Sequence, residues 1–305
     1  MSVPVPAGVQ AGYPLERLTT ARTGGAGEFF ARAGEQAQLL ELLAWAERSG
    51  LQVSVVGSGS NLLIADEGVA GLVVKLERGL AAIELHERER RIVCGGGARL
   101  PQVAASAARA GLTGIEFGVN IPGTMGGAVR MNANAYGGEL GRVLEWVQVA
   151  SARGLERRAP GELGLAYRSS NLAPGEIVAR AGLALQASQP ERVKRTLAEM
   201  RRMRHEAQPQ GIRTFGSTFK NPGDPRAGGR SAGLLLAEAG CAGLAVGGAR
   251  FAPKHANFIE NTGEASTADV IEVIARGRSA VLERFGVELE PEVQTLGEVR
   301  FPWAR

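Results

Sequence analysis

Small residues dominate two neighbouring segments near the middle of this chain, Gly118 to Ala128 and Met131 to Gly138. Glycine lacks a Cβ, so the main chain there can approach a bulky group closely and turn its N–H groups toward an anion such as a pyrophosphate. A third small-residue stretch, from Gly57 to Leu62, precedes them. Together these segments predict a large phosphorylated cofactor that is held from two sides.

Length and charge limit the classes of protein to consider. A chain of 305 residues exceeds the usual single core, so we expect two or three domains. Hydrophobic residues make up 44% and charged residues 22%, as in ordinary soluble globular proteins. The net charge is only +4 and the basic residues are scattered, which argues against a nucleic-acid partner but suits small anionic ligands.

The remaining composition predicts a cytoplasmic protein without a metal or a membrane span. Cys94 and Cys241 lie far apart and are typical of buried free thiols in a reducing compartment. We find no basic segment before an apolar run at the N-terminus and no stretch near 18 apolar residues, so we expect neither a signal peptide nor a transmembrane helix. His86, His205 and His255 form no metal-binding pattern. Nothing indicates an obligate protein partner.

Helices and strands are predicted to alternate without a regular βαβ repeat, which indicates the α+β class. Periodicity and caps predict helices over 35–49, 100–110, 190–203, 231–239 and 267–285. Strands are predicted over 51–56, 62–64, 71–76, 143–151, 177–185, 257–260 and 288–295, with a hairpin over 81–94. The break at 208–211 predicts a boundary between a region 1–206, with subdomains of about 1–76 and 77–206, and a domain 207–305.

The segment 57–62 has three interpretations. It follows a strand and precedes Glu77 by about twenty residues, as in a Rossmann fingerprint. However, Leu62 stands at the third glycine position, and the following residues are typical of strand and turn rather than of the helix that this mechanism needs. A tight structural turn is the second interpretation. An anion-binding loop of backbone amides with Ser58, Ser60 and Asn61 is the one we favour.

Three polar motifs combine reactive side chains. The segment 215–222 joins a hydroxyl, an amine and an amide, although a local turn with a solvated lysine would have the same residues. The segment 167–171 is either a polar loop or part of a site. Residues 289–293 alternate as in a strand, so Glu290 and Glu292 are predicted to face one side, most often a solvated one.

Seven motifs in order resemble the UDP-N-acetylenolpyruvoylglucosamine reductase (MurB) family of bacterial peptidoglycan synthesis. The resemblance extends from about Leu18 to Leu296. The motifs are GSGSNL (57–62), IPGTMGGA (121–128), NANAYGGE (132–139), YRSS (167–170), GSTFKNP (216–222), KHANF (254–258) and EPEV (290–293).

The resemblance implies an FAD-binding domain of the vanillyl-alcohol-oxidase/PCMH type followed by a smaller α+β substrate-binding domain. It further implies a flavoprotein oxidoreductase with non-covalent FAD and with NADPH as co-substrate. Hydride would pass by way of the flavin N5 to C3 of the enolpyruvyl group of a UDP-sugar, and a proton would reach C2, giving UDP-N-acetylmuramate.

The resemblance also implies site residues. Ser217 would donate the proton, Arg168 would bind the enolpyruvyl carboxylate, and Glu292 would orient the site and relay a proton. Residues implied to bind the cofactor are Gly57, Ser58, Gly59, Ser60, Asn61, Leu62, Ile121, Pro122, Gly123, Thr124, Gly126, Gly127, Ala128, Asn132 and Arg204. Residues implied to bind the UDP-sugar are Lys220, Asn221, Arg230, Lys254 and His255.

The chain departs from the family pattern at Asn120, Asn134 and Gln294, and its length suits the shorter subtype that lacks a loop with a substrate-covering tyrosine. Two other functions stay open. A sugar oxidase with the same flavin fold would be reoxidised by O2 and would not need NADPH. A UDP-sugar-binding protein without catalysis would need none of Arg168, Ser217 and Glu292.

Overall fold

The computed structural model of the protein describes residues 3–303 and divides them into two compact units. The first unit consists of residues 3–12, 28–58 and 70–204, and the second of residues 13–27, 59–69 and 205–303. Each unit is therefore assembled from three separate stretches of the chain.

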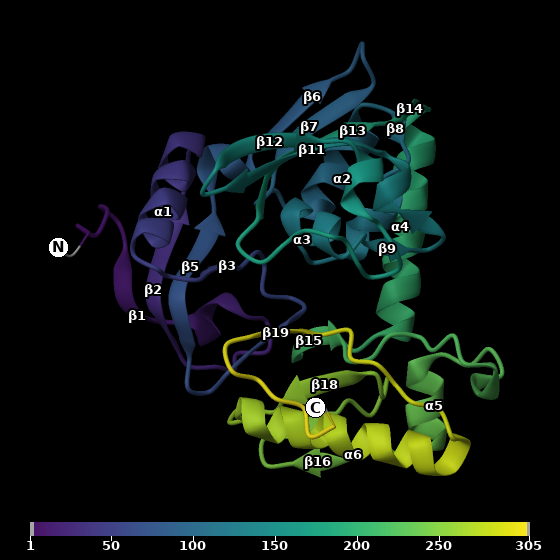
Figure 1. Ribbon diagram of the computed structural model, residues 1–305. Helices are drawn as coiled ribbons and strands as arrows, with labels where there is room; N and C mark the ends of the chain where they lie inside the picture. Colours follow the sequence, from purple (N-terminus) through teal and green to yellow (C-terminus); the bar gives the residue numbers. More distant parts are fainter. Residues whose placement is uncertain (1–2, 304–305) are drawn as a thin grey trace. The chain divides into compact units, whose positions relative to one another are not determined.

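Two sheets form the frame of the first unit (Figure 1). The four-stranded sheet has the order β1 (Gln10–Pro14), β2 (Ala26–Ala33), β5 (Val69–Leu76) and β3 (Val53–Val55). The five-stranded sheet is antiparallel throughout, in the order β12 (Gly154–Arg158), β11 (Leu144–Ser151), β13 (Ile177–Ala184), β7 (Arg91–Gly95) and β6 (Ile83–His86).

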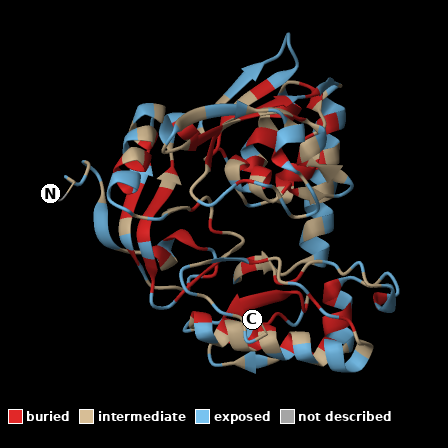
Figure 2. Cartoon of the chain, in the orientation of Figure 1, coloured by how far each residue is buried: buried red, intermediate tan, exposed pale blue. Residues whose placement is uncertain are grey.

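Helices cover both faces of the five-stranded sheet. On one face, α1 (Gln36–Arg48) buries Leu42 and Trp45 in a core that includes Ala179 of β13. On the other, α2 (Leu100–Arg109) and α3 (Met125–Arg130) pack Val103 and Met125 into a core with Leu183 of β13 (Figure 1). Burial on both faces explains the nearly continuous apolar sequence of β13, visible as red strand in Figure 2.

The remaining elements of the first unit are short, apart from one long helix. The helix α4 (Pro190–Ala207) continues to the start of the second unit. The short strands are β8 (Leu112–Thr113), β14 (Gln186–Ala187), β9 (Asn134–Ala135) and β10 (Gly138–Glu139).

Short 3-10 helices occur in both units. They are Leu15–Leu18, Arg78–Ala81, Glu116–Asn120, Leu140–Arg142, Pro160–Leu163 and Pro225–Ala227.

The second unit is an antiparallel sheet with two helices. Its strands follow the order β15 (Arg213–Ser217), β18 (Phe258–Asn261), β17 (Ala249–Phe251) and β16 (Ala245–Val246). The helices α5 (Ala232–Glu238) and α6 (Thr267–Phe285) pack on it around Leu236, Phe251 and Ile274 (Figure 1).

Polar caps fix α6 within this unit. The Ser266 side chain accepts from the backbone N–H of Asp269, and the Asp269 carboxylate accepts from the N–H of Ser266, at 3.0 Å each. Thr267 donates from Oγ1 to the carbonyl of Ile64 at 2.6 Å. The strand that contains Ile64, β4 (Leu62–Ile64), pairs in parallel with β19 (Gln294–Leu296). The early segment 59–69 thereby becomes an integral part of the second unit.

Most sequence predictions about this architecture are confirmed. The mixed topology is of the α+β class, the five predicted helices are present, and Cys94 and Cys241 are buried free thiols. Burial raises the pKa of the Cys94 thiol to about 12. The structure adds β1, β2 and α3, which the sequence patterns did not predict. The boundary near residue 207 stays a prediction.

The predicted strand over 288–295 is wrong for most of its length. Only Gln294–Leu296 forms a strand, β19. Pro291 has no N–H to donate to a ladder, and the residues before it make single backbone contacts with the segment 218–220 instead. The predicted shared face of Glu290 and Glu292 therefore has no strand to define it.

We expect Phe251→Ala to lower the free energy of unfolding by about 3–5 kcal/mol, because it empties a core position. Phe251 is fully buried, and its ring lies so close to Gly277 that a Cβ there would be 2.5 Å from Cζ. Urea denaturation followed by circular dichroism measures the loss. Leu282→Ala is the matched control at a position 37% exposed, and an equal loss there would contradict the burial argument.

Candidate active site

A small cavity of about 90 Å³, partly open to solvent, lies within the first unit. Its walls come from the ends of three strands and the first turn of α3. The lining residues are Val55, Val56, Gly57, Leu76, Gly96, Gly97, Thr124, Gly126, Gly127, Arg130, Glu176, Ile177 and Val178.

Close contacts at glycine residues shape this cavity. A Cβ on Gly57 would overlap Oγ1 of Thr124, and a Cβ on Gly96 would overlap the carbonyl oxygen of Val178. At Gly97 a Cβ would lie 2.5 Å from the carbonyl oxygen of Leu76. Only glycine fits at these positions. Five of the thirteen lining residues are glycines, whose backbone can closely approach a large flat group with an anionic tail.

The cavity brings together part of the predicted cofactor set. Gly57, Thr124, Gly126 and Gly127 line it. The other members within this unit do not belong to its lining; they are Ser58, Ile121, Pro122, Gly123, Ala128, Asn132 and Arg204. The last four residues of the GSGSNL motif, Gly59, Ser60, Asn61 and Leu62, belong to the second unit.

Several lining residues were missed in the sequence. Arg130 lies between the motifs 121–128 and 132–139 and was not singled out, and Glu176 belongs to no motif, so no local signal marked it. Gly96 and Gly97 did have a signal, because Gly95-Gly96-Gly97 is a run of three glycines directly after a predicted strand. Such a run indicates close backbone approach and would have pointed to this wall.

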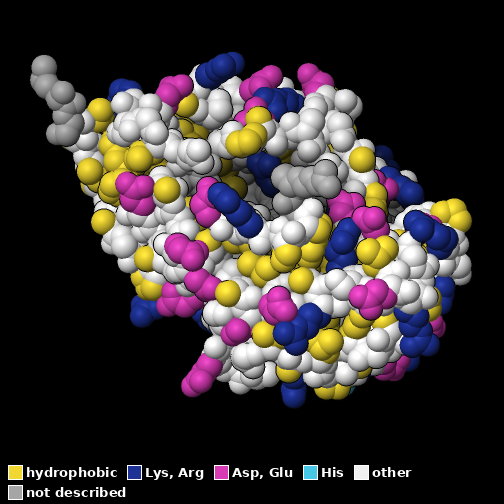
Figure 3. Space-filling model, turned by 60° about the horizontal axis from the view of Figure 1, so that its bottom comes forward, with side chains coloured by type: hydrophobic (Ala, Val, Ile, Leu, Met, Phe, Trp, Pro, Cys, Tyr) yellow, Lys and Arg dark blue, Asp and Glu magenta, His cyan; other side chains and the backbone are white. Residues whose placement is uncertain are grey.

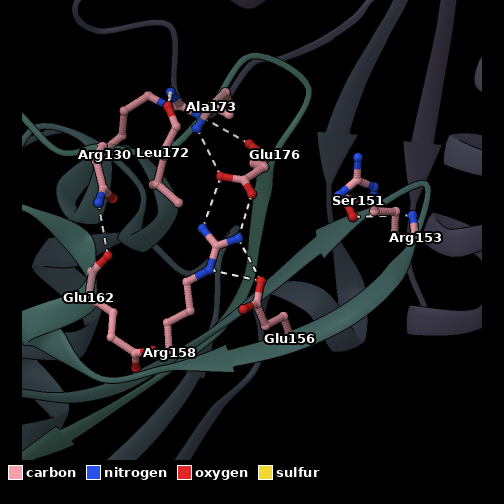
Figure 4. Close-up of polar contacts among 10 residues, drawn as sticks. Arg130, Ser151, Arg153, Glu156, Arg158, Glu162, Leu172, Ala173 and Glu176 are labelled. Carbon is pink, nitrogen blue, oxygen red and sulfur yellow. Dashed lines mark hydrogen bonds and ion pairs between the residues drawn. The ribbon is translucent and has the colours of Figure 1, made fainter.

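A charged network anchors the wall formed by Glu176 (Figure 4). Arg158 donates to the Glu176 carboxylate at 2.5 and 3.0 Å and to Glu156 at 2.6 Å. The N–H of Ala173 also donates to the Glu176 carboxylate, at 2.8 Å. The hydrogen bond from Arg158 is the main reason that the pKa of Glu176 is lowered, and the same interaction raises the pKa of Arg158.

Arg130 holds the same wall by binding backbone carbonyls of the wall. Its guanidinium donates to the carbonyl oxygens of Glu176 at 2.8 Å and Leu172 at 3.1 Å. Burial lowers the pKa of Arg130. Arg158 thus fixes the segment 172–177 through the Glu176 carboxylate, and Arg130 fixes it through two carbonyls.

Lys75 contacts the backbone at Gly57. Its ammonium donates to the carbonyl oxygen of Gly57 at 3.1 Å, and burial lowers its pKa. The interaction orients the turn that forms one wall of the cavity.

Arg168 is held in a strained turn of the first unit. Its φ is +56°, in the left-handed region that non-glycine residues rarely adopt, and Tyr136 has a φ of +51°. Arg168 donates from Nη1 to the carbonyl oxygen of Asn134 at 3.2 Å. Asn132, buried and also at positive φ, donates to the carbonyl of Ala166 at 3.3 Å. The loops around 134 and 168 therefore support each other.

Arg204 anchors α4 to the glycine-rich segment. Its guanidinium donates to the carbonyl oxygen of Asn120, and burial lowers its pKa. Asn120, a departure from the family pattern, donates to the carbonyl of Met200 at 2.7 Å and to the hydroxyl of Tyr136 at 2.9 Å. These contacts join α4, the glycine segment and the Tyr136 turn.

Ser217 follows a β-bulge in the second unit. Thr214 is opposite Glu260 and Ser217 is opposite Phe258, so β15 has one residue more than β18 between these pairs. Gly216 supplies the left-handed conformation that the bulge requires, with a φ of +85°. A bulge redirects the side chain that follows it, which here is the hydroxyl of Ser217.

Backbone hydrogen bonds place the Glu292 segment beside the Ser217 segment. The N–H of Glu292 donates to the carbonyl of Thr218 at 2.8 Å. The Glu292 carbonyl accepts from the side-chain amides of Asn61 at 3.2 Å and Gln294 at 3.1 Å. Gln294, another departure from the family pattern, therefore helps to hold the glutamate in place.

Glu290 has a different environment from Glu292. Its carboxylate is 71% exposed and pairs with the ammonium of Lys220 at 2.5 Å. The N–H of Lys220 donates to the carbonyl of Glu290 at 2.9 Å. Lys220, predicted to bind substrate, is thus held to the same segment that carries Glu292.

The other predicted substrate residues fall into two groups. Asn221 and His255 both contact the first turn of α5, since Asn221 Oδ1 accepts from the N–H of Ala232 at 3.1 Å and a Cβ on Gly233 would lie 2.6 Å from Cε1 of His255. Burial lowers the pKa of His255. Arg230 and Lys254 are held elsewhere, by the carboxylate of Glu238 at 2.9 Å and the carbonyl of His205 at 2.9 Å.

Within residues 3–303 we also looked for a metal site, a membrane-spanning helix and a basic surface patch. No three His, Cys, Asp or Glu side chains there gather as metal ligands would, and none of the helices described is long and apolar enough to cross a bilayer. On the face shown in Figure 3, basic side chains are interspersed with acidic ones and form no single basic patch.

Comparison with known proteins decides the family. Residues 28–159 match an FAD binding domain, and residues 208–296 match the C-terminal domain of UDP-N-acetylenolpyruvoylglucosamine reductase. The reductase of that name from Heliobacterium modesticaldum is 41% identical over 287 residues, covering 93% of this chain and 90% of the relative. The chain belongs to the UDP-N-acetylenolpyruvoylglucosamine reductase (MurB) family.

Two further relatives of this chain agree with the family assignment. The reductase from Gloeobacter violaceus is 41% identical over 294 residues, covering 95% of this chain and 96% of the relative. The crystal structure of MurB from Thermus caldophilus is 36% identical, with a TM-score of 0.80 over 93% of this chain and 97% of that one. The predicted family, the FAD-binding domain and the C-terminal domain that follows it are confirmed.

We expect Gly57→Ala to raise the Kd for FAD at least about tenfold, a loss of about 1.4 kcal/mol. The new methyl group would overlap Thr124 Oγ1 and push apart two walls of the cavity. Fluorescence titration of FAD-free protein measures the Kd. Gly161→Ala is the control, since a Cβ there would meet nothing within 4 Å. Unchanged affinity in the Gly57 variant would contradict the placement of FAD in this cavity.

We expect Glu176→Gln to lower the free energy of unfolding by about 1–3 kcal/mol at neutral pH, because it removes a charged hydrogen-bond partner. Since folding lowers the pKa of this carboxyl, its stabilisation is full above 4.5, the ordinary value, and is lost as the pH falls through the folded-state pKa. Denaturation from pH 7 to pH 3 tests this. Glu156→Gln removes the exposed partner of the same arginine and should cost far less. A pH-independent difference would contradict the argument.

Proposed function

We propose that the protein is a cytoplasmic MurB that uses NADPH and non-covalent FAD to reduce UDP-N-acetylglucosamine enolpyruvate to UDP-N-acetylmuramate in peptidoglycan synthesis. The observation that carries this proposal is the 41% identity to named reductases over nine-tenths of their length. The cavity supports it, because five of its lining residues are glycines, whose backbone can approach a large flat cofactor with a diphosphate. When bound, FAD supplies hydride transfer between NADPH and the enolpyruvyl double bond.

Arg168 binds the enolpyruvyl carboxylate in this proposal. As C3 of the substrate accepts hydride, negative charge develops at C2 and spreads into the carboxylate. A guanidinium is always charged and forms two parallel hydrogen bonds with a carboxylate. Because the charge grows toward the transition state, Arg168 stabilises that state more than the ground state. The strained turn that carries Arg168 supports such a role, since strain accumulates at functional positions.

Ser217 donates the proton to C2 in this proposal, and Glu292 orients the site and relays a proton back to the serine. A serine hydroxyl is a weak acid, so it needs a carbanion-like acceptor and fixed geometry. Its position after the bulge and the hydrogen bond from the N–H of Glu292 to the Thr218 carbonyl support the pairing of these two residues. The UDP-sugar is held by Lys220, Asn221, Arg230, Lys254 and His255.

We expect Ser217→Ala to slow reoxidation of the reduced flavin by the enolpyruvyl substrate by about 10²–10⁴-fold, because proton donation is lost. Reduction of the flavin by NADPH should stay unchanged, since it requires no serine proton. Stopped-flow absorbance of the holoenzyme measures both half-reactions. Arg168→Ala should also slow reoxidation and should still purify with FAD.

Three outcomes would contradict the proposed function. Equal slowing of both half-reactions in Ser217→Ala would remove the proton-donor role. Loss of FAD from Arg168→Ala would place that residue at the cofactor instead. Rapid reoxidation by O2 with a sugar substrate and without NADPH consumption would identify a sugar oxidase of the same fold.

A further inference from the structure

We propose that Asn257 is a positioning residue that holds the Ser217 hydroxyl in its reactive orientation. The inference rests on the proposed role of Ser217 as proton donor. Asn257 immediately precedes β18, the strand that pairs with the Ser217 strand. Its side chain is buried, with only 4% of the residue exposed, so it contacts the fold rather than solvent.

The side chain of Asn257 makes hydrogen bonds to the backbone beyond the point where the pairing of β15 with β18 ends. Regular pairing between β15 and β18 ends at Ser217 and Phe258. Beyond it, Asn257 Oδ1 accepts from the N–H of Phe219 at 2.9 Å, and Asn257 Nδ2 donates to the carbonyl of Phe219 at 2.9 Å. The backbone carbonyl of Asn257 accepts from the N–H of Thr218 at 2.7 Å. Three hydrogen bonds thus fix the two residues that follow the serine.

Only an amide of this length can make this arrangement. One planar group must present an acceptor to the N–H and a donor to the C=O of the same residue, as a neighbouring strand would. Aspartate keeps the acceptor but loses the donor and adds a buried charge. Leucine keeps the shape but has neither group. An asparagine therefore suits this position, because its amide binds both the N–H and the C=O of Phe219.

Asn257 is itself held from the other side. Its N–H donates to Nδ1 of His255 at 3.2 Å, and the His255 ring packs edge-on against Phe258 with 5.0 Å between ring centres. Burial lowers the pKa of His255, which favours the neutral ring whose Nδ1 can accept this hydrogen bond. Besides its proposed contact with the UDP-sugar, His255 therefore helps to hold Asn257 through Nδ1.

The opposite edge of the 218–220 segment is fixed by the Glu292 segment. There, the N–H of Glu292 donates to the Thr218 carbonyl and the N–H of Lys220 donates to the Glu290 carbonyl. Ser217 thus lies between the bulge glycine, Gly216, and the segment 218–220, which is held by Asn257 on one edge and by the 290–292 segment on the other. Release of one edge lets the serine shift, and a shift of about 1 Å costs about 10²-fold in rate.

The test compares half-reactions of the holoenzyme. We expect Asn257→Asp and Asn257→Ser to slow flavin reoxidation by the enolpyruvyl substrate by about 10–100-fold, with flavin reduction by NADPH unchanged. Asn261→Asp and Asn261→Ser are matched controls. Asn261 is also a buried asparagine of this strand region, with four hydrogen bonds to the backbone of Ala21, Arg22, Gly263 and Ala265, and none of these residues adjoins Ser217. The controls should change stability but neither half-reaction.

A double-mutant cycle separates positioning from general structural damage. If Asn257 acts through Ser217, then Asn257→Asp in the Ser217→Ala background causes no further loss of the reoxidation rate. Additive losses in the double variant, or equal slowing of both half-reactions, would overturn the inference. Failure of both Asn257 variants to fold, while both Asn261 variants fold, would overturn it too, since Asn257 would then maintain the fold rather than one hydroxyl.

The same experiments distinguish this inference from the proposed function. If Ser217→Ala leaves reoxidation unchanged, the proton-donor role fails. If Ser217→Ala slows reoxidation while the Asn257 variants do not, the role of Ser217 stands and only the positioning role of Asn257 fails.

Discussion

Contact between main-chain segments at a few glycines determines the shape of the first unit around its cavity. Gly57, Gly96 and Gly97 each face a neighbouring atom at a distance that leaves no room for a Cβ. Charged side chains then hold the remaining wall, through Arg130 on the carbonyls and Arg158 on the carboxylate of Glu176. Backbone at glycines therefore forms part of the cavity wall, and these charged side chains keep that wall in position.

The second unit uses side-chain amides for the same purpose. Asn61 and Gln294 hold the carbonyl of Glu292, and Asn257 holds both polar groups of Phe219. Amides can stand in for a neighbouring strand wherever regular pairing stops, because each presents a donor and an acceptor. Two segments that are distant in sequence and carry proposed catalytic residues are thereby kept in register without a continuous sheet.

The sequence was most informative where the structural signal is local. Ser266 and Gly286 mark the two ends of α6 through capping, and the predicted bounds agree with the structure. The motif residues Gly57 and Thr124 line one cavity, and their role in binding FAD stays a prediction. Residues 288–293 were misassigned because their alternation reflects contacts with separate neighbours, and Pro291 interrupts any ladder. The place of Glu176 in the cavity and the grouping of 13–27 and 59–69 with the C-terminal region depend on long-range contacts, which leave no local pattern.

The assembly of the second unit from early and late stretches has a consequence for biosynthesis. Leu63 leaves the ribosome some two hundred residues before the partner strand β19 and the helix α6 that shield it. Until translation is nearly finished, this apolar strand has no native partner and is a natural target for chaperones. The order of the chain thus delays completion of the proposed catalytic unit to the end of synthesis, after the cofactor-binding unit already has its whole sequence.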